Sequence, residues 1–220
     1  MSAVALSIEL QGVGKDYGPV RALDAISVSL ERGALVWLAG ANGAGKSTLL
    51  RVLGSLTRPT RGSASLFGVD PFSSRGASVR ARVGFLGQDA ALYAELSIAE
   101  NLRFCARLRG AAESELHRVA SELELGPVLD QRVRTLSQGY RRRAGLARAL
   151  LGAPELVLLD EPWNGLDSAS AERLTALLVR LRDAGAVVLV AAHAASGPLP
   201  RFDRTIRLEA GRIAADGAAA

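Results

Sequence analysis

Long apolar runs, a basic leader and cysteine pairs are all missing from this sequence of 220 residues. No apolar run reaches the roughly 18 residues of a membrane-spanning helix, and the longest, around residues 184–195, is interrupted by Gly185 and His193. The first twelve residues lack the basic start and long apolar stretch of a signal peptide. Cys105 is the only cysteine, which excludes an internal disulfide and a multi-cysteine zinc site. We therefore expect a soluble, cytoplasmic protein.

Lysine is also scarce, since 25 of the 27 basic residues are arginines and only Lys15 and Lys46 are lysines. A formal net charge of +5 and a pI of about 10.1 would suit nucleic acid or anionic lipid as a partner. The arginines are spread along the chain with acidic residues between them, and their excess over lysine is typical of compositional bias. We therefore expect a solvated basic surface and no direct contact with nucleic acid.

What is present is an alternation of short apolar strands and helical segments, which predicts an α/β fold with a mainly parallel sheet. The predicted strands are 6–13, 26–30, 34–39, 64–67, 83–86, 156–159, 187–192 and a final hairpin of 205–208 with 212–215. Helices are predicted at 46–56 and 168–184. From 97 to about 152 the pattern is helical, beginning with the capping box Ser97-Ile98-Ala99-Glu100, so the α/β core carries a helical insertion.

Residues 40–47 read Gly-Ala-Asn-Gly-Ala-Gly-Lys-Ser and match the P-loop pattern G-x-x-x-x-G-K-[ST]. Small residues let the backbone wrap around phosphate oxygens, and the helix that follows adds its positive N-terminal end. Lys46 would contact the β- and γ-phosphates, and the Ser47 hydroxyl would coordinate Mg²⁺. The predicted phosphate-binding residues are Gly40, Ala41, Asn42, Gly43, Ala44, Gly45, Lys46, Ser47 and Thr48.

A second acidic motif follows the buried strand at 156–159, which ends in Asp160 and Glu161. This position puts both acids at the carboxyl edge of a parallel sheet, where open α/β folds bind ligands. Asp160 would hold Mg²⁺ through water, and Glu161 would orient or deprotonate the attacking water.

These two motifs and the residues between them resemble the ATP-binding cassette (ABC) ATPases, the nucleotide-binding subunits of ABC transporters, over almost the whole chain. Residues 136–140, Leu-Ser-Gln-Gly-Tyr, resemble the family signature LSGGQ. They depart from it at Gln138 and Tyr140, but Ser137 and Gly139, which carry the phosphate contact, remain.

The resemblance extends to four single residues with family roles. Gln88 matches the glutamine of the Q-loop, Asp167 the acid of the D-loop and His193 the switch histidine. Tyr17 matches the aromatic residue that stacks on adenine. The resemblance thus implies catalytic roles for Glu161, His193 and Gln88 and Mg²⁺ contacts from Ser47, Gln88 and Asp160.

The resemblance also implies one ABC domain over residues 1–220. About 1–90 and 153–220 would form the ATP-binding core with an N-terminal antiparallel β subdomain, and about 91–152 the helical signature subdomain. In the family, Ser137 and Gly139 face the P-loop of a second subunit, so two ATP molecules are held in a head-to-tail dimer. We expect a homodimer.

The function implied is ATP hydrolysis that drives export through separate integral membrane permease subunits, with the protein peripheral on the inner face of the cell membrane. Export is favoured because residues 92–110 resemble those of export-type cassettes and the chain stops soon after 212–215, without the C-terminal regulatory domain of many importers. The haem exporter of cytochrome c maturation is one candidate system. The alternative is a soluble, non-transport ABC ATPase acting on nucleic acid or the ribosome, although such translation proteins usually carry two cassettes.

Overall fold

Two sheets form the framework of the computed structural model, which describes residues 6–192 and 199–218. In the smaller sheet, β1 (Leu6–Tyr17) pairs antiparallel with both β2 (Val20–Glu31) and β4 (Arg61–Leu66), giving the order β2-β1-β4. β1 and β2 are each 12 residues long and therefore extend well beyond the predicted 6–13 and 26–30. This sheet is the antiparallel β unit that the resemblance implied.

The larger sheet has the order β5-β6-β7-β3-β8-β9. Its strands are β5 (Val83–Leu86), β6 (Leu156–Asp160), β7 (Val187–Ala191), β3 (Leu35–Ala39), β8 (Arg204–Glu209) and β9 (Arg212–Ala218). All neighbouring pairs run parallel except β8 with β9, which form the predicted antiparallel hairpin. The prediction of an α/β fold with a mainly parallel sheet is therefore confirmed.

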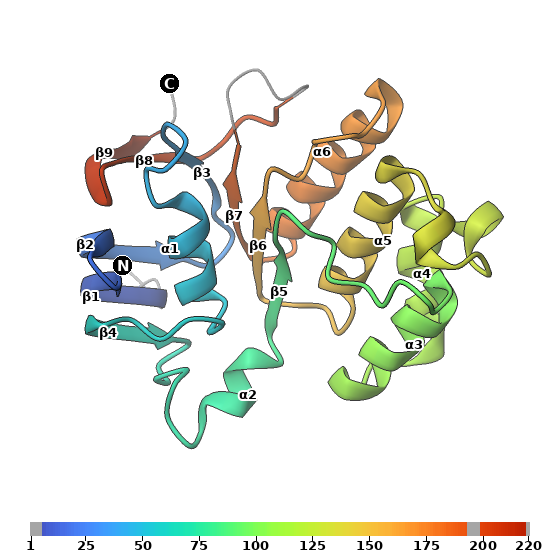
Figure 1. The fold of residues 1–220 in the computed structure, drawn as a ribbon, viewed down its shortest axis with the longest axis horizontal. Helices are drawn as coiled ribbons and strands as arrows, with labels where there is room; N and C mark the ends of the chain where they lie inside the picture. Colours follow the sequence, from blue (N-terminus) through green and yellow to red (C-terminus); the bar gives the residue numbers. More distant parts are fainter. Residues whose placement is uncertain (1–5, 193–198, 219–220) are drawn as a thin grey trace.

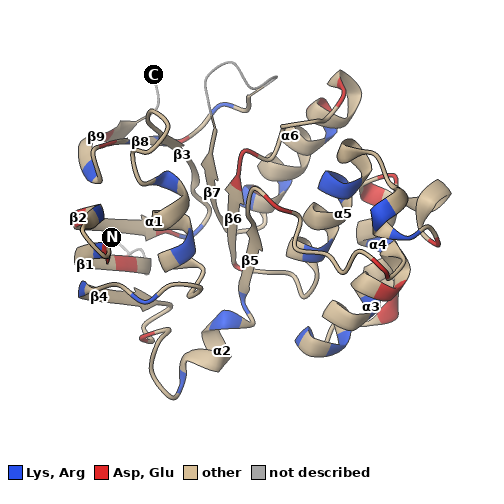
Figure 2. Cartoon of the chain, viewed as in Figure 1, with Lys and Arg blue, Asp and Glu red and all other residues tan. Residues whose placement is uncertain are grey.

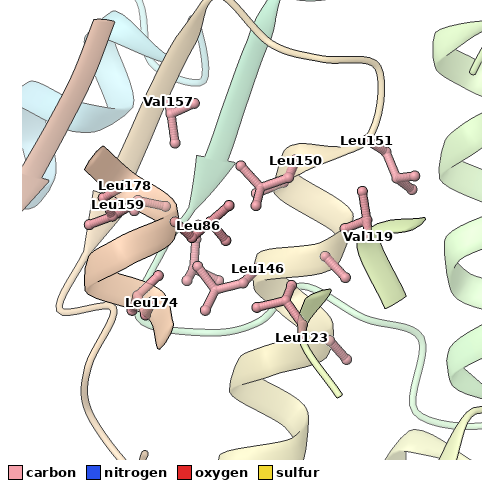
Figure 3. Packing of buried hydrophobic residues seen from close by; sticks show 14 of the residues in the cluster. Leu86, Val119, Leu123, Leu146, Leu150, Leu151, Val157, Leu159, Leu174 and Leu178 are labelled. Carbon is pink, nitrogen blue, oxygen red and sulfur yellow. The ribbon is translucent and has the colours of Figure 1, made fainter. Parts of the chain in front are cut away.

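Both faces of the larger sheet are covered. Figure 1 shows α1 (Lys46–Leu53) and the smaller sheet on one side, and α5 (Gln138–Leu150) with α6 (Ser168–Asp183) on the other. Successive side chains of a strand point to opposite faces of the sheet, so each strand contributes to the apolar clusters on both sides. On β6, Leu158 packs with α1, whereas Val157 and Leu159 pack with α5 and α6 (Figure 3).

The helical insertion consists of α3 (Ile98–Arg109), α4 (Glu113–Glu122), two 3₁₀ turns (Gly126–Val128 and Val133–Thr135) and α5. The predicted capping box starts α3: the Ser97 hydroxyl accepts from the Glu100 N–H at 3.1 Å, and the Glu100 carboxylate accepts from the Ser97 N–H at 2.7 Å. Leucine and valine side chains of α4 and α5 join one apolar cluster with those of α6 (Figure 3).

Three further features concern helices and charge. The five-residue α2 (Gly76–Arg80) was not predicted. Within residues 6–192 and 199–218, no helix is both long and apolar enough to cross a membrane. Arg, Lys, Asp and Glu are mixed over the elements of both halves rather than separated by sign (Figure 2).

Candidate active site

A cleft of about 900 Å³ opens where the carboxyl ends of β3, β5 and β6 meet. One wall consists of P-loop residues 42–48, which follow β3. The others include Gln88 after β5, Asp160 and Glu161 at the end of β6, and residues from the start of α5. Segments that are more than 100 residues apart in the sequence thus share one cleft, because parallel strands end at the same edge of their sheet.

The P-loop runs directly into α1, whose N-cap residue is Gly45. Gly45 has φ +104°, and an added Cβ would lie 2.6 Å from the Ala22 carbonyl oxygen of β2, so only glycine fits this close approach. No side chain caps the start of α1 and its first turn contains no acidic residue. The helix therefore presents uncapped N–H groups and its positive end to the cleft.

Lys46 is buried at the base of the cleft. Its Nζ donates to the carbonyl oxygens of Gly40 at 2.7 Å and Ala41 at 3.0 Å. The lysine is thus held by its own loop with its charge beside the cleft, as a phosphate-binding cation requires.

The acidic pair at the end of β6 faces the same cleft, and both residues are buried. Glu161 has φ +50°, an uncommon conformation for a residue with a side chain. Its N–H donates to the Ala191 carbonyl oxygen of β7 at 2.7 Å. Such backbone conformations persist only where the surroundings enforce them, and they concentrate at functional sites.

Gln88 lines the cleft with an exposed side chain, and its backbone is held by Arg142, which is not among the predicted site residues. Arg142 of α5 is buried and donates to the carbonyl oxygens of Gly87 at 2.7 Å and Gln88 at 3.0 Å. Burial lowers the pKa of Arg142, and the carboxylates of Asp160 and Glu161 offset part of that effect. The only sequence signal for it was the run of arginines at 141–143 near a helix start, where positive charge needs a partner.

The signature residues lie at the start of α5. Ser137 is exposed and caps the helix by accepting from the Tyr140 N–H at 3.3 Å. An added Cβ on Gly139 would lie 2.9 Å from the carbonyl oxygen of Gly165. Gln138 lines the cleft, but Ser137 and Gly139 do not.

Two of the remaining predicted residues, Tyr17 and Asp167, are not among the residues that line the cleft of this chain. Tyr17 is 45% exposed at the end of β1, next to Lys15, and is not part of the cleft lining. Asp167 caps α6 by accepting from the Ser170 N–H at 2.7 Å, which lowers the pKa of Asp167. His193 lies outside the described residues. In the part of the chain that is described, no group of three His, Cys, Asp or Glu side chains is arranged to hold a metal ion.

Known proteins are similar to this chain in both sequence and fold. Residues 23–164 match the family model described as ABC transporter. The daunorubicin/doxorubicin resistance ATP-binding protein DrrA of Streptomyces peucetius is 35% identical over 215 residues, which cover 96% of this chain and 65% of that protein. The Nod factor export ATP-binding protein I of Rhizobium meliloti is 36% identical over 221 residues, which cover 97% of this chain and 64% of that protein. Import proteins match too: the sulfate/thiosulfate import ATP-binding protein CysA of Bordetella bronchiseptica is 38% identical.

The chain spans a little under two thirds of the length of these curated relatives. Among solved structures, the post-hydrolysis dimer of an ATP-binding cassette bound to ADP and Pi has a TM-score of 0.87 and 26% identity. That alignment covers 96% of this chain and 98% of the other. The chain therefore belongs to the ABC transporter family, as an ATP-binding cassette.

Proposed function

We propose that this protein is the ATP-binding subunit of an ABC transporter and hydrolyses ATP to drive export through separate membrane subunits. The observation that carries the proposal is one cleft shared by the P-loop with Lys46 and by the acidic end of β6 with Asp160 and Glu161. A cation and free N–H groups suit phosphates, and buried carboxylates suit a metal ion and a water molecule. P-loop ATPases use this combination.

The start of α1 fits the phosphates of a nucleotide. Its uncapped N–H groups and the absence of an acid from its first turn leave the positive end of the helix available to an anion. Lys46 adds a full positive charge that is already oriented by the carbonyl groups of Gly40 and Ala41. We expect the remaining residues of 40–48 to bind phosphate mainly through their backbone.

Three side chains of the cleft fit Mg²⁺: the hydroxyl of Ser47, the amide oxygen of Gln88 and the carboxylate of Asp160. Mg²⁺ prefers oxygen ligands and is commonly held by one or two carboxylates together with substrate phosphates. Bound Mg²⁺ would neutralise negative charge on the phosphates. The protein's own part is to present these oxygens at one edge of its sheet.

Glu161 is the proposed general base. Its side chain lies in the cleft, and its backbone is fixed by the hydrogen bond to β7. It would accept the proton of the attacking water, while Gln88 and His193 would orient that water or the phosphate.

A second copy of the chain completes the proposed site. Ser137 and Gly139 do not line the cleft of their own chain, and Ser137 is exposed at a helix start, where anions bind well. These two residues would therefore contact the ATP bound by the partner. Asp167 and Tyr17 would act in the same closed dimer, on the nucleotide.

Partner membrane subunits are supported by an exposed apolar patch formed by Tyr93, Phe104 and Leu108, which are 58%, 43% and 71% exposed. The rings of Tyr93 and Phe104 lie 5.5 Å apart, edge to face. Exposed apolar side chains that gather in one patch mark sites of protein contact. A permease docked on this patch would hold the protein at the inner face of the cell membrane.

Export rather than import is supported by the export-like sequence of residues 92–110 and by relatives named for drug resistance and Nod factor export. Haem as cargo stays a prediction, since neither relative is named for haem. The dispersed arginines in Figure 2 offer no support for the nucleic-acid alternative.

The first test compares ATP turnover of the full-length protein with that of Glu161→Gln. Loss of a positioned base should lower the rate by about 100-fold or more while ATP binding persists. The matched control is Glu209→Gln, the same exchange at an exposed position at the end of β8. Turnover of Glu161→Gln close to that of the control would remove Glu161 from the mechanism.

The second test concerns the dimer. With saturating ATP and Mg²⁺, Glu161→Gln should sediment as a dimer, because a ligand that binds the dimer more tightly than the single chain stabilises the dimer by mass action. Adding Ser137→Arg should abolish that dimer by filling the anion site at the start of α5. A double variant that dimerises as well as Glu161→Gln would show that the signature assignment is wrong.

A further inference from the structure

Arg142 is a buried arginine in the first turns of α5 whose guanidinium group contacts two loops of the cleft. Its Nη1 donates to the carbonyl oxygens of Gly87 and Gln88 at 2.7 and 3.0 Å. Its Nη2 donates to the carbonyl oxygen of Glu161 at 2.7 Å and also to that of Asp160. One side chain thus binds the carboxyl ends of both β5 and β6.

Each of these nitrogens binds the carbonyl groups of two consecutive residues. Such a pair of bonds restrains the backbone angles of the second residue of the two. The carbonyl groups of Gly87 and Gln88 flank the φ and ψ angles of Gln88. Those of Asp160 and Glu161 flank the φ and ψ angles of Glu161. Since Glu161 has φ +50°, the bonds to Arg142 contribute to holding a conformation that the residue would otherwise avoid.

The guanidinium group of Arg142 is a buried positive charge, and burying a charge costs free energy unless hydrogen bonds compensate for it. Among the described residues, the hydrogen-bond acceptors of Arg142 are backbone carbonyl groups and not carboxylates, and its Nε is buried without a hydrogen-bond partner. Its charge is therefore met by carbonyl dipoles and by the more distant carboxylates of the cleft. A buried charge of this kind is tolerated only where its hydrogen bonds are well formed.

We propose that Arg142 is a positioning residue that sets the backbone of Gln88 and Glu161 relative to each other and to the start of α5. This inference rests on the proposed ATPase function. Because the same helix begins with Ser137, Arg142 links the residue that would contact the partner's ATP with the residues that act on the chain's own ATP. The hydrogen bonds of Arg142 to described residues all go to backbone carbonyl groups.

The chain offers a matched control in Arg109, a partly buried arginine that also donates to backbone carbonyl groups. Its partners are Val83 at 2.9 Å and Leu151 at 2.8 Å, at the opposite end of β5 from Gln88. Burial lowers the pKa of both Arg109 and Arg142. Loss of either guanidinium should therefore weaken the fold, but only loss of Arg142 should disturb the cleft.

The experiment measures kcat and KM for ATP, together with the thermal unfolding midpoint, in Arg142→Gln, Arg142→Lys and Arg109→Gln. Misplacement of catalytic groups by about 1 Å can lower a rate by about 100-fold, so we expect Arg142→Gln to lose 10- to 100-fold in kcat with KM changed by less than about threefold. Arg142→Lys keeps the positive charge and should recover part of the lost kcat. Recovery should be incomplete, because one ammonium group cannot bind four carbonyl groups in a plane. Arg109→Gln should lower the unfolding midpoint but keep the wild-type kcat.

Different results would contradict the ATPase function and the role of Arg142. Absence of ATP turnover in the wild-type protein would contradict the proposed function. Wild-type turnover that Glu161→Gln abolishes, together with an unchanged kcat in Arg142→Gln, would overturn the role of Arg142 alone. If Arg142→Gln does not fold, Arg142→Lys decides the question: a wild-type kcat in that variant overturns the inference, and a reduced kcat with unchanged KM supports it.

Discussion

Replacing Gly45 with alanine should weaken ATP binding, because the P-loop could not keep its position against β2. An added Cβ would lie 2.6 Å from the Ala22 carbonyl oxygen and 3.0 Å from a methyl group of Leu23. Ordinary van der Waals contact begins at 3.4 Å, so the loop and the strand would have to separate by about 0.8 Å. The Ala22 oxygen belongs to the backbone of a paired strand, so we expect the P-loop to move instead.

Two effects of this substitution can be separated by what they change. A left-handed φ costs a residue with a Cβ about 1–2 kcal/mol, which lowers the free energy of unfolding. Displacement of the loop acts on ATP, since a hydrogen bond to a charged group contributes about 1.5–3 kcal/mol and each 1.4 kcal/mol is tenfold in affinity. Loss of one phosphate contact should therefore weaken ATP binding by about 10- to 100-fold.

The assay is a titration with a fluorescent ATP analogue, combined with urea unfolding of the same variant. Gly68→Ala is the control, because Gly68 has φ +79° with no atom within 4 Å of an added Cβ and lies outside the cleft. This control should lose about 1 kcal/mol of unfolding free energy and keep its affinity for ATP. ATP affinity of Gly45→Ala within twofold of wild type would refute the reasoning from the contact with Ala22.

Three further predictions follow from single side chains. Lys46→Ala should weaken ATP binding by about tenfold or more, because a charged hydrogen bond is lost, and unchanged affinity in a titration would assign phosphate binding to the backbone alone. Asn101→Ala should lower the free energy of urea unfolding by about 2 kcal/mol, since it removes the 2.8 Å partner of the Tyr93 N–H from a buried position; a change below about 0.5 kcal/mol would contradict it. Asp167 accepts from the Ser170 N–H, so its pKa in the folded protein lies below the usual 3.8 and the unfolded chain takes up the proton first as the pH falls. Its stabilisation is thus present above about pH 4 and lost below it, and Asp167→Asn should flatten the decline of stability with falling pH; equal slopes for both proteins would refute this.

Elements with a chemical signal at their ends could be predicted closely from the sequence. β5 coincides with the predicted 83–86, which is a short apolar run. α6 begins at the predicted residue 168, directly after the capping Asp167, and ends one residue before the predicted 184. The ends of β1 and β2 could not be predicted. The register between the two strands shifts at several points from Leu10 to Asp16, and these irregularities interrupt the alternation of apolar and polar residues. α2 has five residues, which is too few to show a helical period.

The candidate site divides in the same way. The P-loop and the acidic end of β6 are contiguous motifs, and the rule that parallel strands end at one edge brings them together without further information. Arg142 could not be found by that route. Its acceptors are backbone carbonyl groups up to 55 residues away, and a carbonyl group leaves no mark on the amino-acid sequence.

The excess of arginine over lysine acquires a structural meaning at three positions. Arg109, Arg142 and Arg148 each donate two or more hydrogen bonds to backbone carbonyl groups, and together they reach both ends of β5 and the loop after it. A planar guanidinium group can bind several such acceptors at once, whereas an ammonium group concentrates its charge at one atom. At Lys46 the compact ammonium group is the better choice, since a point charge on a flexible side chain suits the phosphate-binding P-loop. Compositional bias can explain how many arginines the chain contains, but these contacts explain why lysine would not serve at 109, 142 and 148.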